Sequence, residues 1–265
     1  MEKLSAAQAK FLLKEKRHKQ KVFFLRILIL ILFIAVWEAA ARGGLINDFI
    51  FSSPSRIGSL FLTMAKDGSI FYHIGVTLME TVASFLLVTV LGLLLAILLW
   101  SNKGISETLE PYLVVLNSLP KSALAPVLIV WLGNNLKTII VVGIIIAVFG
   151  SIITLTTGFL GVDQDKIKLI YTLGGKKKDV LSKVLVPSSI PIIISTMKVN
   201  IGLCLVGIII GEFLAANKGL GYLIIYGSQV FKMDLVMLSI IVLCVLSAIL
   251  YYFITMLEKK VKKKF

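Results

Sequence analysis

Residues 139–160 read IIVVGIIIAVFGSIITLTTGFL and contain no charged side chain. A helix needs about 20 mostly apolar residues to cross a bilayer, and a run of this length is too long for a strand of a membrane barrel. The whole chain is similarly apolar: 58% of its 265 residues are hydrophobic, 16% are charged, and the mean hydropathy is +0.97. A water-soluble protein needs more polar surface than this. The stretch therefore predicts a transmembrane helix.

Further apolar runs of similar length lie on both sides of this one. The six expected spans are Phe23–Ala41, Val76–Trp100, Leu113–Leu132, Ile139–Leu160, Ile190–Gly211 and Leu235–Leu257. Only helices satisfy their backbone hydrogen bonds in lipid without closing into a barrel. We therefore predict an all-α integral membrane protein with six transmembrane helices, in a domain covering residues 22–258.

Basic residues give the chain a net charge of +14 and gather beside the apolar runs. If the N-terminus is cytoplasmic, nineteen Lys and Arg residues fall in inner segments and six in outer ones. Cytoplasmic segments carry this excess in membrane proteins, so we expect both termini to face the cytoplasm. The basic residues lack the interleaved aromatic residues of a single-strand binding platform, and we expect no nucleic-acid partner.

The two ends of the chain are polar and basic. Residues 1–21 place Leu4, Phe11 and Leu12 among lysines, which indicates an amphipathic helix on the membrane surface; a disordered basic tail fits equally well. The segment lacks the apolar stretch and cleavage site of a signal peptide. Residues 259–265 are expected to form a basic cytoplasmic tail.

Several kinds of chemistry are absent from the sequence. There is no Gly-x-x-x-x-Gly-Lys-Ser/Thr phosphate loop to hold ATP, no serine elbow and no pair of catalytic carboxylates. The few Cys and His residues lack the spacing of a metal site. These residues are Cys204, Cys244, His18 and His73. We therefore expect no metal, no cofactor and no enzymatic activity in this chain.

The loop at residues 161–189, between spans four and five, is too long and too patterned to be a simple connector. Apolar residues recur in it at helical spacing, a glycine pair predicts a helix end, and a second helical stretch leads to a proline. The loop residues singled out are Ile167, Ile170, Tyr171, Gly174, Gly175 and Pro187. A short helix with one apolar face needs a partner for that face. Another subunit and the chain's own spans are equally good candidates.

The loop also resembles a known pattern. Gly174, twelve residues and Pro187 are similar to the signature loop of the permeases of binding-protein-dependent ATP-binding-cassette importers. That family has a Glu-Ala-Ala triplet beginning six residues before the glycine, where this chain has Lys168-Leu169-Ile170.

Three other stretches are similar to patterns of the same family, in the same order. They are Phe51-Ser52-Ser53-Pro54-Ser55, then Asn117–Pro126 continuing to Trp131-Leu132-Gly133, and Glu212 followed by Lys218–Ile224. Together the matches indicate the nitrate, sulfonate and taurine branch. Pro54 should also start a short helix at about residues 55–65.

The resemblance implies a type-1 transmembrane domain that forms the path for a small solute, such as nitrate, a sulfonate or taurine. A vitamin precursor, such as a thiamine pyrimidine or riboflavin, is the alternative cargo. Two copies of the chain, or the chain and a paired relative, would line the path in a bacterial inner membrane. A cytoplasmic ATPase dimer would bind ATP and Mg and hold the loop at 161–189 as a coupling helix. A solute-binding protein would dock outside.

The alternative from another class is an ion-coupled carrier or a channel. A carrier should show internal repeats and several acids near mid-membrane. The sequence shows no repeat, and Glu80 and Glu212 lie near span ends, where exposure explains Glu80.

Four residues are candidates for the path or for gating, three because polar and ionisable groups at membrane depth are costly and one because it can kink a span. They are Asn117, Pro120, Lys121 and Glu212. Pro120 should kink the third span. Simpler interpretations are that Lys121 reaches back to the cytoplasmic interface, and that Glu212 pairs with Lys218 or caps a local turn.

Overall fold

The computed structural model describes residues 6–262, and every regular element within that range is helical. The chain divides into two compact units, Met1–Thr63 and Met64–Phe265. Residues 1–5 of the expected amphipathic segment and residues 263–265 of the expected tail lie outside the described residues.

The first unit contains α1 (Ala6–Arg42), α2 (Asp48–Phe51) and most of α3 (Pro54–Lys66). Helix α1 runs without interruption from the basic segment into the first expected span, so no helix boundary falls at residue 21. Helix α3 confirms the expected short helix, with Pro54 as its first residue, where the missing N–H group has no helical partner in any case.

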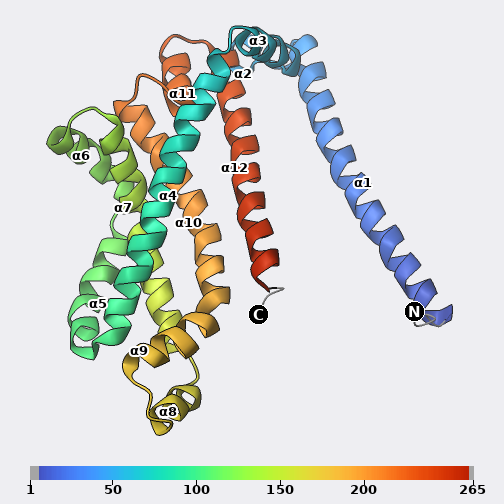
Figure 1. The fold of residues 1–265 in the computed structure, drawn as a ribbon. Coiled ribbons are helices and arrows are strands. Elements are labelled where there is room, and N and C mark those ends of the chain that lie inside the picture. Colours follow the sequence, from blue (N-terminus) through green and yellow to red (C-terminus); the bar gives the residue numbers. More distant parts are fainter. Residues whose placement is uncertain (1–5, 263–265) are drawn as a thin grey trace. The chain divides into compact units, whose positions relative to one another are not determined.

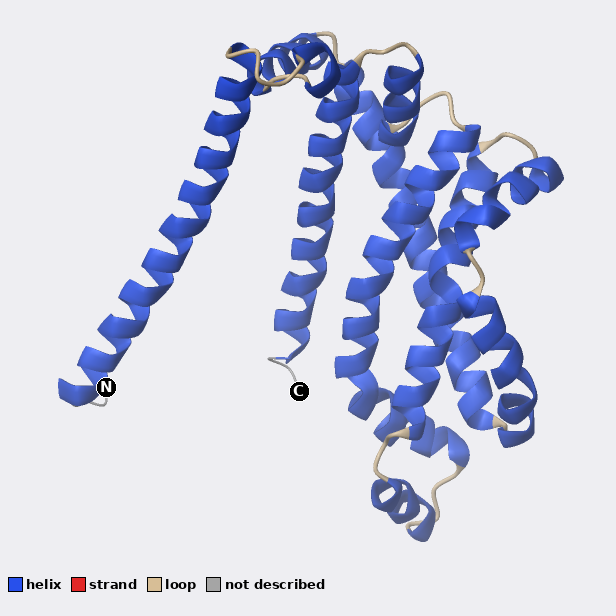
Figure 2. Cartoon of the chain, turned by 180° about the vertical axis from the view of Figure 1, so that it is seen from behind, coloured by secondary structure: helices blue, strands red, loops and turns tan. Residues whose placement is uncertain are grey.

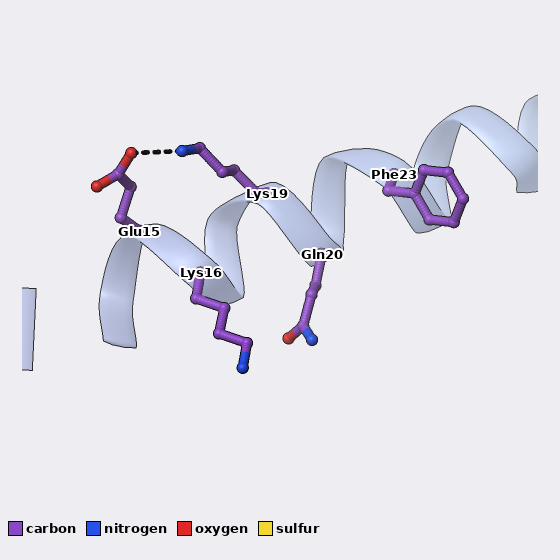
Figure 3. Close-up of a pocket in the computed structure, with 5 residues that line it drawn as sticks. All are labelled: Glu15, Lys16, Lys19, Gln20 and Phe23. Atoms are coloured by element: carbon purple, nitrogen blue, oxygen red, sulfur yellow. Dashed lines mark ion pairs between the residues drawn. The ribbon is translucent and has the colours of Figure 1, made fainter. Parts of the chain in front are cut away.

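A surface hollow beside the basic part of α1 is lined by residues of that helix alone. They are Glu15, Lys16, Lys19, Gln20 and Phe23, drawn in Figure 3. Glu15 and Lys19 form an ion pair at 2.7 Å, one turn apart. Because only one helix borders the hollow, it offers no enclosed binding site.

The second unit is a helical bundle whose long helices run side by side, with loops at their ends (Figures 1 and 2). Its centre is formed by α4 (Ser69–Ser101), α7 (Leu136–Leu160) and α10 (Val186–Ala215), flanked by α11 (Leu220–Gln229) and α12 (Met233–Lys262).

Small residues let the three central helices approach closely. A Cβ atom on Gly207 would lie 2.7 Å from the Cα of Gly143, and one on Gly143 would lie 2.7 Å from the Oγ of Ser84. Helices in lipid associate largely through such close packing. The three residues therefore fix the distances between α10, α7 and α4.

The third expected span is broken rather than kinked. It consists of α5 (Lys103–Ser118), a 3₁₀ turn (Lys121–Leu124) and α6 (Ala125–Leu132), with a bend of 86°. Leu119, which precedes Pro120, is extended, as the proline ring requires. The span expected over Leu113–Leu132 therefore contains a full break where the sequence predicted only a kink at Pro120, and its first helix begins earlier, at Lys103.

The number of spans follows from this break. Within residues 6–262, five helices are long and apolar enough to cross a membrane, and the α5–α6 pair makes six if it counts as one span. The other five expected spans each lie within an unbroken long helix.

Candidate functional site

Lys121 opens the 3₁₀ turn at the break in the third span. Its Nζ donates to Asn117 Oδ1 at 2.9 Å and to the main-chain oxygen of Ile146 at 3.2 Å. Ile146 lies near the middle of α7, so the ammonium group sits level with the centre of that helix. A lysine that reaches for the interface would point toward a helix end. This position does not match that interpretation of Lys121.

A cavity of about 140 Å³ lies between α7 and α10. It is lined by Gly150, Thr154, Ser195, Thr196, Val199, Asn200 and Leu203. Asn117 reaches its edge, because the Asn117 Oδ1 atom lies 3.4 Å from the position of a Cβ atom on Gly150. We call Lys121, Asn117 and this cavity the Lys121 site. Thr154 and Ser195 could not be singled out from the sequence, since hydroxyl residues are common inside spans as hydrogen-bonding partners.

A second lysine at membrane depth has a different environment. Lys198 of α10 forms an ion pair with Glu258 of α12, and its Nζ lies 5.7 Å from the centre of the Tyr251 ring. Within the described part of the chain, no carboxylate pairs with Lys121. Lys198 therefore has a countercharge within the bundle, and Lys121 has only neutral partners.

Glu212 is fully buried near the end of α10 and joins three helices. Its Oε1 accepts a hydrogen bond from the Thr77 hydroxyl of α4 at 2.7 Å, and its Oε2 accepts one from the N–H of Gly221 at 2.5 Å. The Thr77 oxygen in turn accepts from the N–H of Leu220 at 2.8 Å. We call these four residues the Glu212 cluster. It lies at the α11 end of the bundle, opposite α8 (Figure 1).

The cluster decides between the two expectations for Glu212. The carboxylate accepts from the first N–H groups of α11, which have no partner inside the helix. Lys218 instead lies with its Nζ 5.9 Å from the centre of the Tyr72 ring. Glu212 therefore caps a local turn, as the second expectation stated.

The glycines around Leu220 are needed because the carboxylate passes so close to them. A Cβ atom on Gly219 would lie 2.2 Å from Glu212 Oε1, and one on Gly221 would lie 2.7 Å from Oε2. Gly219 also has a φ of +106°, which side-chain-bearing residues rarely adopt. The Gly-Leu-Gly sequence after the acid thus has a local physical cause.

Glu80 was interpreted from the sequence as an exposed residue, and this is wrong. Its side chain is only 2% exposed, and it lies within hydrogen-bonding reach of the Glu212 carboxyl group. Its Oε2 atom has no hydrogen-bond partner among the described residues. The error arose because Glu80 and Glu212 are far apart in the sequence, and only the packing of α4 on α10 brings them together.

The loop between spans four and five folds largely as expected. It begins with α8 (Gln164–Thr172), followed by α9 (Lys177–Val180) and a π-helical segment (Leu181–Leu185) that leads into α10. After α8, Gly174 has a φ of +79° and donates to the Tyr171 oxygen at 3.0 Å, while Gly175 donates to the Ile170 oxygen at 2.9 Å. This is a Schellman motif, and it confirms that the glycine pair ends the helix.

The expected apolar face of α8 is divided between the bundle and the solvent. Ile167 is buried in a cluster with Ala96, Leu155 and Phe159 of α4 and α7, and Ile170 packs against the same cluster. Tyr171 is 48% exposed. The chain's own spans therefore cover Ile167 and Ile170, and Tyr171 remains accessible.

The approach to Pro187 is wider than an α-helical turn. The N–H of Val186 bonds to the oxygen of Leu181, five residues earlier. In a regular helix a proline ring clashes with the carbonyl four residues before it, and the wider turn directly precedes Pro187. On the other side of the loop, Lys177 donates to the main-chain oxygen of Ser101 and lies 5.7 Å from the Trp100 ring centre.

Comparison with known proteins agrees with this architecture. The chain is 29% identical to a protein of Haemophilus influenzae named as an ABC transporter permease, over 85% of this chain and 91% of that one. It is 26% identical to a Bacillus subtilis protein, SsuC, named as an aliphatic sulfonates transport permease, over 98% and 94% of the two chains. The inward-facing MetNI methionine ABC transporter contains a chain of the same fold, with a TM-score of 0.65 at 19% identity, covering 72% of this chain and 95% of that one.

A family model described as "Binding-protein-dependent transport system inner membrane component" matches residues 88–263. These residues include the broken third span, the loop between spans four and five, and Glu212 with its glycines. The chain therefore belongs to this family and is the membrane-spanning permease subunit of an ATP-binding-cassette importer.

Proposed function

We propose that two copies of this permease form the path for a small anion, and that a cytoplasmic ATPase dimer drives the path by binding to α8. ATP and Mg would be held by that partner. The anion is suggested by the Bacillus subtilis relative, which is named for aliphatic sulfonates. The observation that carries the ATPase proposal is the exposed apolar surface of α8.

Three large apolar side chains of the α8 region face the solvent. Leu169 is 58% exposed, Tyr171 is 48% exposed and Leu173 is 74% exposed. Apolar groups gathered on a short, capped helix beyond the ends of the spans indicate an interaction surface. We infer that a groove of the ATPase covers these three residues, and that α8 serves as the coupling helix.

The buried side of α8 can transmit a displacement to the bundle. Ile167 packs with Phe159 of α7 and Ala96 of α4. The far side of the loop continues as helix into α10. Movement of the ATPases would thus shift both α7 and α10, as alternating access requires.

The remaining partners follow from the same arrangement. A solute-binding protein would dock at the α11 end of the bundle, and α8 and both termini would face the cytoplasm of a bacterial cell with the permease in its inner membrane. The excess of basic residues on the proposed inner side supports this orientation.

The test is co-purification from native membranes in mild detergent. We expect the tagged chain to bring down an ATPase, and we expect the double variant Tyr171→Asp, Leu173→Asp to lose it, because two charges would enter an apolar contact. The matched control is Gln164→Asp, which adds a charge to the first turn of the same helix, where a carboxylate is tolerated.

Two results would contradict the proposal. One is recovery of the native chain without an ATPase. The other is an equal yield of ATPase with the double variant and with Gln164→Asp, which would place the docking surface elsewhere.

A further inference from the structure

The Lys121 ammonium group is a partly buried positive charge at the break in the third span, and no carboxylate pairs with it among the described residues. Its described hydrogen bonds go to an amide oxygen of Asn117 and a main-chain oxygen of Ile146. Ionisable groups at membrane depth pair with an opposite charge or mark the path of a solute. Lys198 pairs with the opposite charge of Glu258. Lys121 has no such ion pair among the described residues.

The broken helix places this charge where a solute can reach it. Lys121 follows directly on the extended residues Leu119 and Pro120, between α5 and α6. Secondary transporters bind their cargo at such helix interruptions near the middle of the membrane, and the same physical reason applies here, because an interrupted helix exposes polar groups to a solute. The contact with Ile146, near the centre of α7, gives Lys121 the corresponding depth.

Further hydrogen-bond donors lie between Lys121 and the neighbouring cavity. An ammonium group has three N–H donors, and two of them serve Asn117 and Ile146. Asn117 turns its oxygen toward Lys121, which leaves its NH₂ group as a donor. The cavity next to Gly150 adds the hydroxyl groups of Thr154 and Ser195.

The size and charge of the cavity limit what fits. Its volume is about 140 Å³, and a water molecule occupies roughly 30 Å³ in the liquid, so a solute of a few non-hydrogen atoms fits. Its lining residues carry no carboxylate. Lys121 reaches the edge of the cavity through Asn117, so its positive charge disfavours a cation there. An oxyanion placed between Asn117 and Lys121 would instead receive a charge-assisted hydrogen bond.

We propose that the Lys121 site binds a small oxyanion, of the sulfonate or nitrate kind, on its way through the membrane. Lys121 supplies the charge, the Asn117 amide supplies a directed donor, and the hydroxyl groups of the cavity replace part of the hydration shell. This proposal rests on the proposed function in one respect, namely that the bound anion is the transported solute.

The experiment measures anion-dependent stabilisation of the detergent-solubilised complex. Nitrate and methanesulfonate are titrated against gluconate at constant ionic strength, and the unfolding temperature is recorded. We expect both probes to raise it for the native chain and for Lys121→Arg, which keeps the charge. We expect no shift for Lys121→Met. The matched control is Lys137→Met, which removes an exposed charge from the first turn of α7 and should keep the shift.

A second arm measures uptake of labelled methanesulfonate and nitrate by cells that carry the whole transporter. Lys121→Met should lower the uptake of the transported anion about tenfold or more, the loss expected when a charge-assisted hydrogen bond disappears. Lys137→Met should leave it unchanged.

The outcomes separate the two proposals. A shift retained by Lys121→Met, or no shift with the native chain, overturns the anion site. The presence of the ATPase in the purified complex is checked before any anion is added. Its absence overturns the proposed function and leaves the anion site to be tested separately. In that event the same titration is made on the chain alone, because every residue of the site belongs to it.

Discussion

The Glu212 cluster and the Lys121 site differ in how their ionisable groups are buried and hydrogen-bonded. In the Glu212 cluster the carboxylate is fully buried, and both of its oxygens accept hydrogen bonds from Thr77 and Gly221. In the Lys121 site the ammonium group is only partly buried, it has neutral partners, and its partner Asn117 reaches the edge of a cavity. Buried charges with their hydrogen bonds satisfied fix an arrangement of helices. A charge without a countercharge is available to a ligand.

The difference predicts opposite responses to substitution. Changes in the Glu212 cluster should lower the stability of the folded protein, because they leave buried polar groups without partners. Changes in the Lys121 site should alter transport and leave stability nearly unchanged. Three measurements of unfolding in detergent test this contrast, from the largest expected effect to the smallest.

Gly219→Ala should cause the largest loss. The new methyl group would lie 2.2 Å from Glu212 Oε1, in a backbone with a φ of +106°. Overpacking and an unfavourable φ together should lower the free energy of unfolding by roughly 3–5 kcal/mol. Thermal unfolding followed by intrinsic fluorescence measures this.

The control for that variant is Gly202→Ala, in α10, where no atom lies within 4 Å of the added group. Alanine is the better helix former, so this variant should be as stable as the native chain or slightly more so. Equal stability of the two alanine variants would show that the Glu212 carboxylate does not hold the turn.

Thr77→Ala should have an intermediate effect. It removes the donor to Glu212 and the acceptor for the N–H of Leu220, and unsatisfied buried groups cost about 1–3 kcal/mol. Thr77→Ser keeps the hydroxyl group and should recover most of the loss. If the serine variant is as unstable as the alanine variant, the missing methyl group is the cause and the hydrogen bonds are not.

Lys121→Met should have the smallest effect on stability. It removes two hydrogen bonds to neutral groups, but it also removes the cost of a charge inside the bundle. We expect the free energy of unfolding to change by less than about 1 kcal/mol, because the removed cost of the charge offsets most of the loss of two hydrogen bonds worth about 0.5–1.5 kcal/mol each. A loss as large as that of Thr77→Ala would show that Lys121 mainly stabilises the fold. The Lys121 site and the Glu212 cluster would then not differ in the way proposed here.

Features that depend on residues close together in the sequence could be predicted, and contacts between distant spans could not. Hydropathy placed the long helices, and the Gly174-Gly175 pair marked the end of α8 because a Schellman cap depends on adjacent residues. Pro120 signalled a distortion, since it lacks an N–H group. The bend of 86° was not predictable, because the packing of α6 determines the direction that the chain takes after the break.

The two clusters show the same limit. Glu212 and its glycines lie close in sequence and were identified as a unit, but Thr77 and Glu80 come from α4 and were missed. Lys121 was recognised as a candidate from its charge alone. Its contact with Ile146 and the nearby cavity depend on how α5 and α10 pack on α7.

The Glu212 cluster also restricts the order in which this sequence can diverge. Gly221 has no room for a methyl group while the glutamate side chain lies 2.7 Å from its Cβ position. A residue larger than glycine can therefore appear at position 221 only after a shorter residue has replaced Glu212. Conversely, glutamate can return to position 212 only after glycine has returned to position 221. Gly219 stays constrained even then, because a φ of +106° is unfavourable for any residue that carries a side chain. The two glycines should consequently vary differently among homologues, position 221 together with position 212 and position 219 hardly at all.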